Sequence, residues 1–296
     1  MKKLAYSIET ISAQTQLIGL IGWPVSHSFS PAMHNAAAAA LGLDWVYVPL
    51  PVHPDDVEAA IRGLPALRFR GVNVTVPHKQ AVIPFLDEIE AGARAIGAVN
   101  TIVIDRTLET GGWRLVGYNT DWAGFLADLE ALAVDVAGRD CLILGAGGSA
   151  RAVAYGLATA GSRVHVLARR VEQAEQLAAG LAPLFEDSQF SSQPLSELSA
   201  AVGNYTASLI VNTTPLGMIP AVDTSPWPGN LPFPGDAFVY DLVYNPAQTK
   251  LMQQARAAGC RTANGLGMLV RQGALAFRLW TGQEPDVAVM AEAIRI

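Results

Sequence analysis

Short runs of apolar residues alternate along the chain with amphipathic or alanine-rich stretches, which predicts alternating strands and helices. In the N-terminal part, the predicted strands are residues 16–22, 45–50, 71–76, 98–104 and 114–118, and the predicted helices are residues 30–41, 54–62 and 121–133. Ser30 is the expected N-cap of its helix because Pro31 follows it. Pro77 is expected to open a helical turn that carries His78 and Lys79.

The same alternation continues toward the C-terminus. The predicted strands there are residues 141–144, 163–167, 208–212, 238–242 and 260–263, and the predicted helices are a stretch ending at residue 160 and residues 171–181, 249–258, 265–280 and 286–294. Residues 182–194 are mixed in composition and residues 221–235 are rich in proline and glycine, so both are expected to be loops. The alternation predicts an α/β fold with a mostly parallel sheet in each domain.

The chain of 296 residues is long enough for two domains with cores of their own. We expect residues 1–120 to form the first domain, with residues 1–14 as a polar, mobile leader. Residues 121–263 are expected to form a Rossmann-like, doubly wound nucleotide-binding domain. Residues 264–296 are expected to be helices that return to the first domain, which makes that domain discontinuous.

The stretch from residue 140 to residue 170 has the pattern strand, glycine-rich turn, helix, strand. The turn is Gly145-Ala146-Gly147-Gly148-Ser149-Ala150. Gly145 permits a tight turn, Gly147 lets the backbone approach a pyrophosphate, and Ala150 is small enough for helix–sheet packing. The following helix offers N–H groups and a partial positive charge to phosphates. A glycine-rich turn in an ordinary α/β unit is the alternative, but the context favours a nucleotide site.

The end of the second strand of this stretch indicates which nucleotide binds. An acidic residue there would bind the ribose 2′-hydroxyl of NAD, whereas this chain has Ala168-Arg169-Arg170. Arginine suits the 2′-phosphate of NADP, so NADP(H) is the expected cofactor. The alternative is that both arginines are solvated surface residues.

The composition limits the classes of partner. With a net charge of −6, the chain lacks the basic footprint of a nucleic-acid-binding protein, and its apolar stretches are too short to span a membrane. The histidines and cysteines show no metal-ligand spacing, so no metal is expected. Cys141 and Cys260 are expected to be buried thiols in strands, which favours a reducing, cytoplasmic compartment. The first six residues lack the apolar core of a secretory signal.

Several polar residues lie near the expected ends of strands, where the packing of the core does not require polar side chains. They are Ser28, Ser30, Thr75, Lys79, Asn100 and Asp121. Ligands of open α/β sheets bind outside the carboxyl ends of strands, so these residues are candidates for a substrate site. Taken singly, Lys79 could be a surface lysine, and Asp121 or Ser30 only a helix cap.

Several motifs occur along the chain in one order. They are Ser28-Phe29-Ser30-Pro31-Ala32-Met33-His34-Asn35, Asn73-Val74-Thr75-Val76-Pro77-His78-Lys79, Gly97-Ala98-Val99-Asn100-Thr101, Asn119-Thr120-Asp121, Gly145-Ala146-Gly147-Gly148, Asn212-Thr213-Thr214-Pro215-Leu216-Gly217-Met218 and Asn264-Gly265-Leu266-Gly267-Met268-Leu269-Val270-Arg271-Gln272. As a set they resemble the shikimate dehydrogenase family. The resemblance implies two α/β domains with a cleft between them. It also implies reversible reduction of 3-dehydroshikimate to shikimate with NADPH, a step of chorismate and aromatic amino acid biosynthesis.

The resemblance further implies roles for individual residues. Lys79 and Asp121 are the implied catalytic pair. The implied substrate contacts are Ser28, Ser30 and Tyr244 at the carboxylate and Thr75, Asn100 and Gln272 at the ring hydroxyls. The implied cofactor contacts are Gly145, Ala146, Gly147, Gly148, Ser149, Ala150, Arg169, Arg170, Thr213, Val243, Gly265 and Met268. The chain departs from the family's pattern at residues 168–170, where Asn-Arg-Thr is usual, and at Phe29, where lysine is frequent.

These residue types suit the reduction of a ketone. The cofactor carries the hydride, and a lysine ammonium can stabilise and protonate the oxygen on which negative charge develops. A neighbouring Asp121 would favour the charged form of Lys79. Paired serines accompany shikimate use within the family, so shikimate is expected over quinate. A quinate/shikimate dehydrogenase of broader specificity and a non-catalytic NADP(H) sensor are alternatives, although Lys79 with Asp121 argues against the sensor. The sequence does not give the oligomeric state, and a homodimer is possible.

Overall fold

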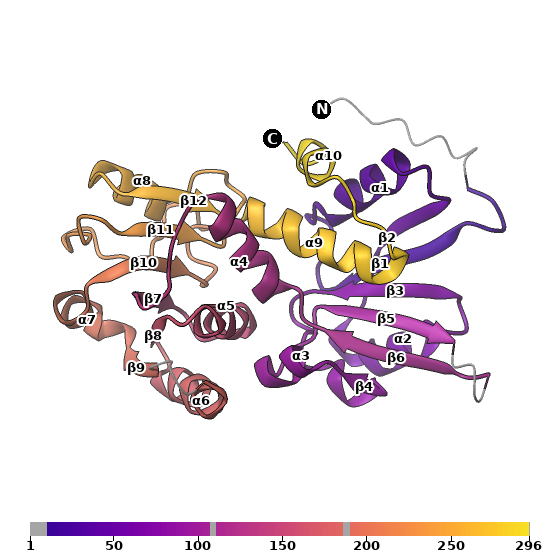
Figure 1. The fold of residues 1–296 in the computed structure, drawn as a ribbon, viewed down its shortest axis with the longest axis horizontal. Helices are drawn as coiled ribbons and strands as arrows, with labels where there is room; N and C mark the ends of the chain where they lie inside the picture. The colour runs from indigo at the N-terminus through magenta and orange to yellow at the C-terminus, as the bar shows by residue number, and fades with distance from the viewer. Residues whose placement is uncertain (1–10, 107–110, 186–189, 296) are drawn as a thin grey trace. The chain divides into compact units, whose positions relative to one another are not determined.

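The computed structural model describes residues 11–106, 111–185 and 190–295, and these residues form two compact units (Figure 1). The first unit comprises the described residues up to Arg94, together with Ala98–Thr120 and Gly273–Arg295. The second unit comprises Ala95–Gly97 and Asp121–Gln272. The expected leader lies outside the described residues as far as residue 10. No helix in the described part of the chain is long and apolar enough to cross a membrane.

The described residues of the first unit form a six-stranded sheet in the order β2-β1-β3-β5-β6-β4. Its strands are β1 (Gln16–Gly22), β2 (Trp45–Pro51), β3 (Phe69–Val74), β4 (Glu88–Ile89), β5 (Thr101–Arg106) and β6 (Trp113–Tyr118). β1, β2 and β3 run parallel, whereas β5 is antiparallel to both β3 and β6. β4 is parallel to β6, so the sheet is mostly parallel, as expected. β5 is antiparallel to both of its neighbours, because a short connection between β5 and β6 allows only antiparallel pairing.

Helices cover both faces of the first unit's sheet. They are α1 (Ser30–Ala40), α2 (Val57–Gly63), α3 (Ala91–Ile96), α10 (Val287–Glu292) and the C-terminal part of α9 (Leu266–Thr281). Ile61 of α2 belongs to the core on one face, and Trp280 of α9 belongs to the core on the other. The Trp280 indole N–H donates to the Ile102 carbonyl at 3.0 Å, and a Cβ at Gly71 would collide with this indole. The close approach of α9 to the sheet therefore requires glycine at residue 71.

The second unit contains an all-parallel sheet in the order β12-β11-β10-β7-β8-β9. Its strands are β7 (Asp140–Leu144), β8 (Arg163–Ala168), β9 (Phe190–Pro194), β10 (Ala207–Asn212), β11 (Phe238–Asp241) and β12 (Arg261–Asn264). Its helices are α4 (Asp121–Ala131), α5 (Gly148–Thr159), α6 (Val171–Leu181), α7 (Leu198–Asn204), α8 (Lys250–Ala257) and the start of α9.

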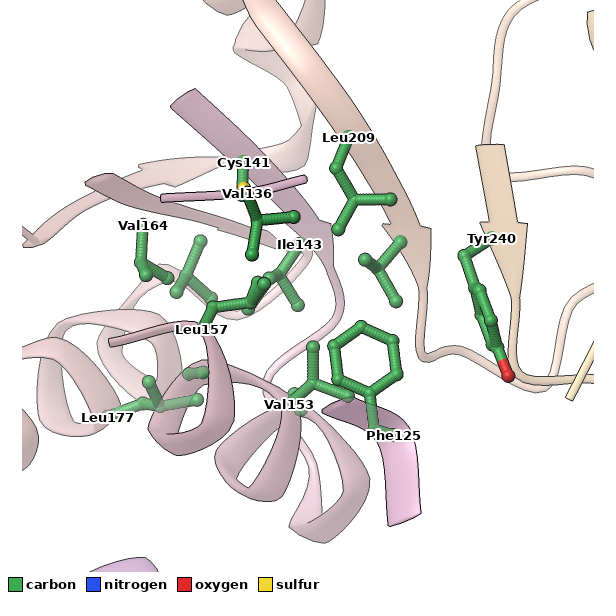
Figure 2. Packing of buried hydrophobic residues seen from close by; sticks show 14 of the residues in the cluster. Phe125, Val136, Cys141, Ile143, Val153, Leu157, Val164, Leu177, Leu209 and Tyr240 are labelled. Carbon is green, nitrogen blue, oxygen red and sulfur yellow. The ribbon is translucent and has the colours of Figure 1, made fainter. Parts of the chain in front are cut away.

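Both faces of the second unit's sheet carry an apolar core, as a doubly wound fold requires. On one face, Phe125 of α4, Val153 of α5 and Leu177 of α6 pack with strand residues such as Ile143 (Figure 2). On the other face, side chains of α7 and α8 pack with the buried Trp227. The Rossmann-like fold expected for this part of the chain is confirmed.

Three local predictions were wrong. Residues 190–194, expected to be loop, form the strand β9, whose half-buried polar residues suit the edge of a sheet and conceal it in the sequence. Ser30 is the first residue of α1 and not its cap, because Phe29 holds the N-cap position. Pro77 opens an irregular turn, and a 3₁₀ helix follows only at Ile83–Phe85.

Candidate functional site

One edge of the first unit's sheet collects most of the predicted substrate residues. Ser28 and Ser30 follow β1, and Thr75 and Lys79 follow β3. Because β5 runs antiparallel to β3, with Thr101 opposite Asn73, the start of β5 lies at this same edge. Asn100, which precedes β5, is thereby brought to the carboxyl ends of β1 and β3.

The two serines form a hydroxyl pair at the start of α1. Ser28 Oγ donates a hydrogen bond to Ser30 Oγ at 3.2 Å, and the Ser30 backbone N–H donates to Ser28 Oγ at 3.2 Å. Ser30 is buried and Ser28 is half-buried. Two adjacent hydroxyls next to the N–H groups of a helix start can both donate to one anion, such as a carboxylate.

A buried hydrogen-bond network lies behind these residues. Asn73 Oδ1 accepts from the Tyr47 hydroxyl at 2.8 Å, and Asn73 Nδ2 donates to the Asn100 carbonyl at 3.2 Å and to Thr101 Oγ1 at 3.1 Å. Burial raises the pKa of the Tyr47 hydroxyl well above its ordinary value, and the neighbouring Ser30 side chain partly offsets this effect. The network therefore links Tyr47 to Asn100 through Asn73, and sequence reasoning did not assign Tyr47 or Asn73 to the site. A tyrosine in a buried strand was the available signal, because its hydroxyl needs a partner.

The Asn100 side chain is held at both of its ends. Its Nδ2 donates to Thr120 Oγ1 at 3.0 Å, and its Oδ1 accepts from the Thr120 backbone N–H at 2.7 Å and from Thr101 Oγ1 at 3.0 Å. Such an amide has a fixed orientation, which suits the recognition of a ring hydroxyl.

The segment that carries Lys79 is anchored through its backbone. The Lys79 carbonyl accepts from the Val99 N–H at 2.8 Å, and a ring nitrogen of the neighbouring, buried His78 lies 2.7 Å from the Val52 carbonyl oxygen. The Thr75 N–H donates to the Ile21 carbonyl at 2.8 Å. These bonds fix the Cα positions of Thr75 and Lys79, while both side chains remain half-exposed.

In the second unit, the glycine-rich turn joins β7 to α5 as predicted. Gly145 has a φ of 113°, and a Cβ there would lie 2.5 Å from Thr213 Oγ1, so only glycine fits. A Cβ at Gly147 or Gly148 would meet nothing within 4 Å, which leaves open space at the start of α5. Ala150 is fully buried, as helix–sheet packing requires. The turn thus presents N–H groups of α5 to open space, where a pyrophosphate can fit.

Arg169 and Arg170 directly follow β8, and both are exposed. Arg170 holds the N-cap position of α6 without a side-chain capping bond. The carboxyl ends of β7 and β8 are neighbours in the sheet, so both arginines lie at the edge that carries the glycine-rich turn. This position matches the expected contact with the ribose of a dinucleotide.

The ends of β10, β11 and β12 bring the remaining cofactor candidates to the same edge of the second unit's sheet. Thr213 follows β10, its hydroxyl donating to the Leu144 carbonyl at 2.8 Å. Val243 follows β11, and Gly265 and Met268 come after β12. A Cβ at Gly265 would collide with the Leu242 carbonyl, so the chain between β12 and α9 passes too close to β11 for any side chain.

One residue of the predicted catalytic pair and two predicted substrate contacts belong to the second unit. They are Asp121, Tyr244 and Gln272. Asp121 is the first residue of α4, and Gln272 lies in α9. The two helices cross at Gly124, where a Cβ would be only 2.6 Å from the Gln272 nitrogen. This crossing keeps Asp121 and Gln272 in a fixed relation to each other.

The predicted site residues thus form two sets. The first unit holds Ser28, Ser30, Thr75, Lys79 and Asn100, and the second unit holds all the others. Lys79 and Asp121, the expected catalytic pair, belong to different units. Within residues 11–106, 111–185 and 190–295, no group of three or more histidine, cysteine or acidic residues could hold a metal ion.

The doubly wound sheet with its glycine-rich turn, together with a separate α/β unit of hydroxyl, amide and lysine groups, defines the class of two-unit, nucleotide-dependent dehydrogenases. Residues 20–102 match the family model of the shikimate dehydrogenase substrate binding domain, and residues 265–295 match that of the shikimate 5′-dehydrogenase C-terminal domain. A shikimate dehydrogenase (NADP(+)) from Moorella thermoacetica is 50% identical over 96% of this chain and 94% of its own. The chain belongs to the shikimate dehydrogenase family.

Solved structures are similar over nearly the full length. A shikimate dehydrogenase in complex with NADP⁺ has 43% identity and a TM-score of 0.86, covering 96% of both chains. The Thermus thermophilus shikimate 5-dehydrogenase, in complex with NADP(H) and shikimate, has 39% identity and a TM-score of 0.78, covering 94% of this chain and 98% of its own.

Proposed function

We propose that the chain catalyses the reversible, NADP-dependent interconversion of shikimate and 3-dehydroshikimate, a step of chorismate and aromatic amino acid biosynthesis. The observation that carries this proposal is one chain with two complementary sheet edges. One edge has the Ser28–Ser30 hydroxyl pair and the fixed Asn100 amide, and the other has the glycine-rich turn followed by Arg169. The relatives named above support the same reaction.

The serine pair binds the ring carboxylate of shikimate. The bond between the two hydroxyls is neutral, and a charge-assisted bond from each serine to a carboxylate is stronger, so the ligand can replace it. Tyr244 provides a further contact with the carboxylate. The proposed contacts with the ring hydroxyls are Thr75, Asn100 and Gln272.

Lys79 and Asp121 are the proposed catalytic residues. The bound nicotinamide ring supplies the hydride chemistry at the carbon that carries the reacting oxygen. In the direction of reduction, the Lys79 ammonium stabilises the developing negative charge on that oxygen and donates a proton to it. Asp121, the first residue of α4, is the second member of the proposed pair. In the direction of oxidation, the neutral amine of Lys79 accepts the proton.

The second unit fits NADP(H). The open space at Gly147 and Gly148 accommodates the pyrophosphate beside the N–H groups of α5. Arg169 is the main partner of the 2′-phosphate, with Arg170 beside it, because both are exposed cations that follow β8. The other proposed contacts are Gly145, Ala146, Ser149, Ala150, Thr213, Val243, Gly265 and Met268.

The proposal extends to compartment and assembly. Cys141 and Cys260 are both free thiols and buried, which supports a reducing, cytoplasmic location. A homodimer is the alternative to a monomer, and sedimentation of the purified protein distinguishes the two.

The test is a panel of initial rates in which NADPH or NADH formation is followed by absorbance, with shikimate or quinate as substrate and NADP or NAD as cofactor. We expect the highest kcat/KM for shikimate with NADP. Comparable values for the two acids would assign the chain to a broader quinate/shikimate dehydrogenase. A protein that binds NADPH but oxidises neither acid would be a sensor.

A further inference from the structure

Asp241, the last residue of β11, is a buried carboxylate to which the catalytic proposal gives no role. Its exposed fraction is 0%, and no ion pair involves it within the part of the chain that the structure describes. Its partners are neutral donors. The Asn212 side-chain amide donates to Oδ1 at 2.8 Å, the Val243 backbone N–H donates to Oδ1 at 3.0 Å, and the Thr249 hydroxyl donates to Oδ2 at 2.6 Å.

A carboxylate is costly at this position. Burial raises the pKa of Asp241 to about 6, and the bonds from Thr249, Val243 and Asn212 only partly offset that effect. A buried acid without a cation is rare in proteins unless its bonds have a use, because a neutral side chain of similar size avoids the desolvation cost.

The partners of Asp241 belong to three different segments at the carboxyl edge of the second unit's sheet. Asn212 ends β10, and its own Oδ1 accepts from the Thr214 N–H at 3.0 Å and the Thr214 hydroxyl at 2.7 Å, which fixes the loop through Thr213. Val243 belongs to the loop after β11. Thr249 is the N-cap of α8 and also accepts from the Met252 N–H.

Two of these segments present proposed cofactor contacts. Thr213 lies against the glycine-rich turn, since a Cβ at Gly145 would meet its hydroxyl oxygen, and its backbone N–H donates to the Leu144 carbonyl at 2.9 Å. Val243 is bonded to the Asp241 carboxylate directly through its backbone N–H. One carboxylate therefore sets the spacing between the loop after β10 and the loop after β11.

We propose that Asp241 is a positioning residue for NADP(H), which acts by holding the Thr213 and Val243 loops at the spacing that the cofactor requires. The inference rests on the proposed function, because the roles of Thr213 and Val243 belong to it. Asp241 itself is buried beneath the loops and touches neither cofactor nor substrate.

The experiment measures the Kd of NADPH by fluorescence titration, without shikimate, for the unmutated protein, Asp241→Ala and Asp241→Asn, well below their unfolding temperatures. Alanine removes the acceptor of three buried hydrogen bonds, so NADPH should bind about tenfold or more weakly. Asparagine keeps one acceptor oxygen for Asn212 and Val243 but turns charge-assisted bonds into neutral ones, so the expected loss is about threefold. Asp236→Asn is the matched control, because Asp236 is an exposed aspartate just before the same strand.

The kinetic readout separates positioning from stability. If Asp241 acts through the two loops, Asp241→Asn should raise the KM for NADP by the same factor as the Kd for NADPH and leave kcat within about twofold. A folded Asp241→Ala with the Kd of the unmutated protein would overturn the inference. If Asp241→Ala does not fold, an unchanged Kd in Asp241→Asn overturns it instead. An unmutated protein that does not bind NADPH would contradict the proposed function itself, which is a different result.

Discussion

The site edge of the first unit's sheet and that of the second unit's sheet differ in which groups are available to a ligand. In the first unit the available groups are side-chain hydroxyls and amides. The Ser30 hydroxyl accepts a hydrogen bond from Ser28, and the Asn100 amide donates one to Thr120. In the second unit the available groups are mainly backbone N–H groups at the start of α5, where Gly147 and Gly148 leave open space. Recognition by side chains can be altered one hydrogen bond at a time, whereas recognition by backbone depends on how the loops are spaced.

This difference predicts that substitutions at the two sheet edges have separate effects. Changes in the first unit should affect substrate binding and turnover and leave NADP binding intact. Changes at the glycine-rich edge of the second unit should affect the cofactor and leave shikimate binding intact, whereas Asp121, Tyr244 and Gln272 of the same unit belong to the proposed substrate site. The experiments below test that separation, in order of decreasing expected effect.

The largest effect is expected for Lys79→Ala in the first unit. Loss of the proposed proton donor should lower kcat by about 100- to 10,000-fold, because general acid–base catalysis contributes on that order. The Kd of NADPH, measured by fluorescence, should stay unchanged. Lys250→Ala is the control, since Lys250 is an exposed lysine of the second unit. A kcat of Lys79→Ala close to that of the unmutated protein would refute the catalytic role.

The next effect is expected for Arg169→Ala in the second unit. The KM for NADP should rise about tenfold or more, because a charge-assisted bond to the 2′-phosphate contributes roughly 1.5–3 kcal/mol. The KM values for NAD and shikimate should change little. Arg139→Ala provides the comparison, because Arg139 is an exposed arginine just before β7, at the opposite edge of the same sheet. Equal losses for NADP and NAD would exclude a specific contact with the phosphate.

A smaller effect is expected for Tyr47→Phe, which removes the hydroxyl that donates to Asn73 in the network behind the serine pair. The KM for shikimate should rise about five- to tenfold, in keeping with the loss of a buried hydrogen bond, and kcat should change less. In the Ser30→Ala background, Tyr47→Phe should add little, because both changes act on one contact. Tyr205→Phe, which removes a hydroxyl bond in the second unit, should not change the KM for shikimate. If the effects of Tyr47→Phe and Ser30→Ala on the KM for shikimate were fully additive, Tyr47 would act independently of Ser30.

The smallest effect concerns the stability contributed by the amino-terminal edge of the second unit's sheet. The bidentate Arg163 guanidinium, helped by His165 and opposed by burial, lowers the pKa of Asp140 to about 2. Because an unfolded aspartate titrates near 3.8, this pair stabilises the fold above about pH 4 and ceases to do so as the pH falls toward 2.

Urea unfolding at several pH values checks this. Asp140→Asn should be less stable than the unmutated protein by about 1 kcal/mol at pH 7, allowing for solvent screening at Arg163, and the difference should shrink between about pH 4 and pH 2. The exposed Asp236→Asn should show no such trend. NADP and shikimate KM values should be unaffected. A difference that does not depend on pH would mean that Asp140 acts through packing and not through its charge.

The alternation of apolar and polar residues predicted the fold better than it predicted details at the strand ends. The second unit's sheet and its glycine-rich turn follow from local patterns, namely the apolar run before Gly145 and the helix after it. The edge strand β9 could not be recognised, because Ser191 and Gln193 need no apolar alternation at a half-buried edge. Ser30 was mistaken for a cap because local sequence cannot show that its hydroxyl accepts a hydrogen bond from Ser28.

In the candidate site, too, the sequence predicted some residues and missed others. The motifs identified residues whose chemistry is unusual for their place, such as Lys79 after β3. They did not identify Tyr47 or Asp241, whose roles depend on partners 26 and 29 residues away in the chain, namely Asn73 and Asn212. Such partners meet only through the pairing of strands, which no single stretch of sequence encodes.

The central claim is that one chain oxidises shikimate through a substrate-binding unit and an NADP-binding unit that contribute independently. It is tested most directly by kcat/KM for shikimate at subsaturating NADP in the unmutated protein, Tyr47→Phe, Arg169→Ala and the double variant. We predict NADPH formation by the unmutated protein and losses that multiply in the double variant, within about 0.5 kcal/mol of additivity. Absence of NADPH formation by the unmutated protein, or a double variant no worse than the poorer single variant, would contradict the claim.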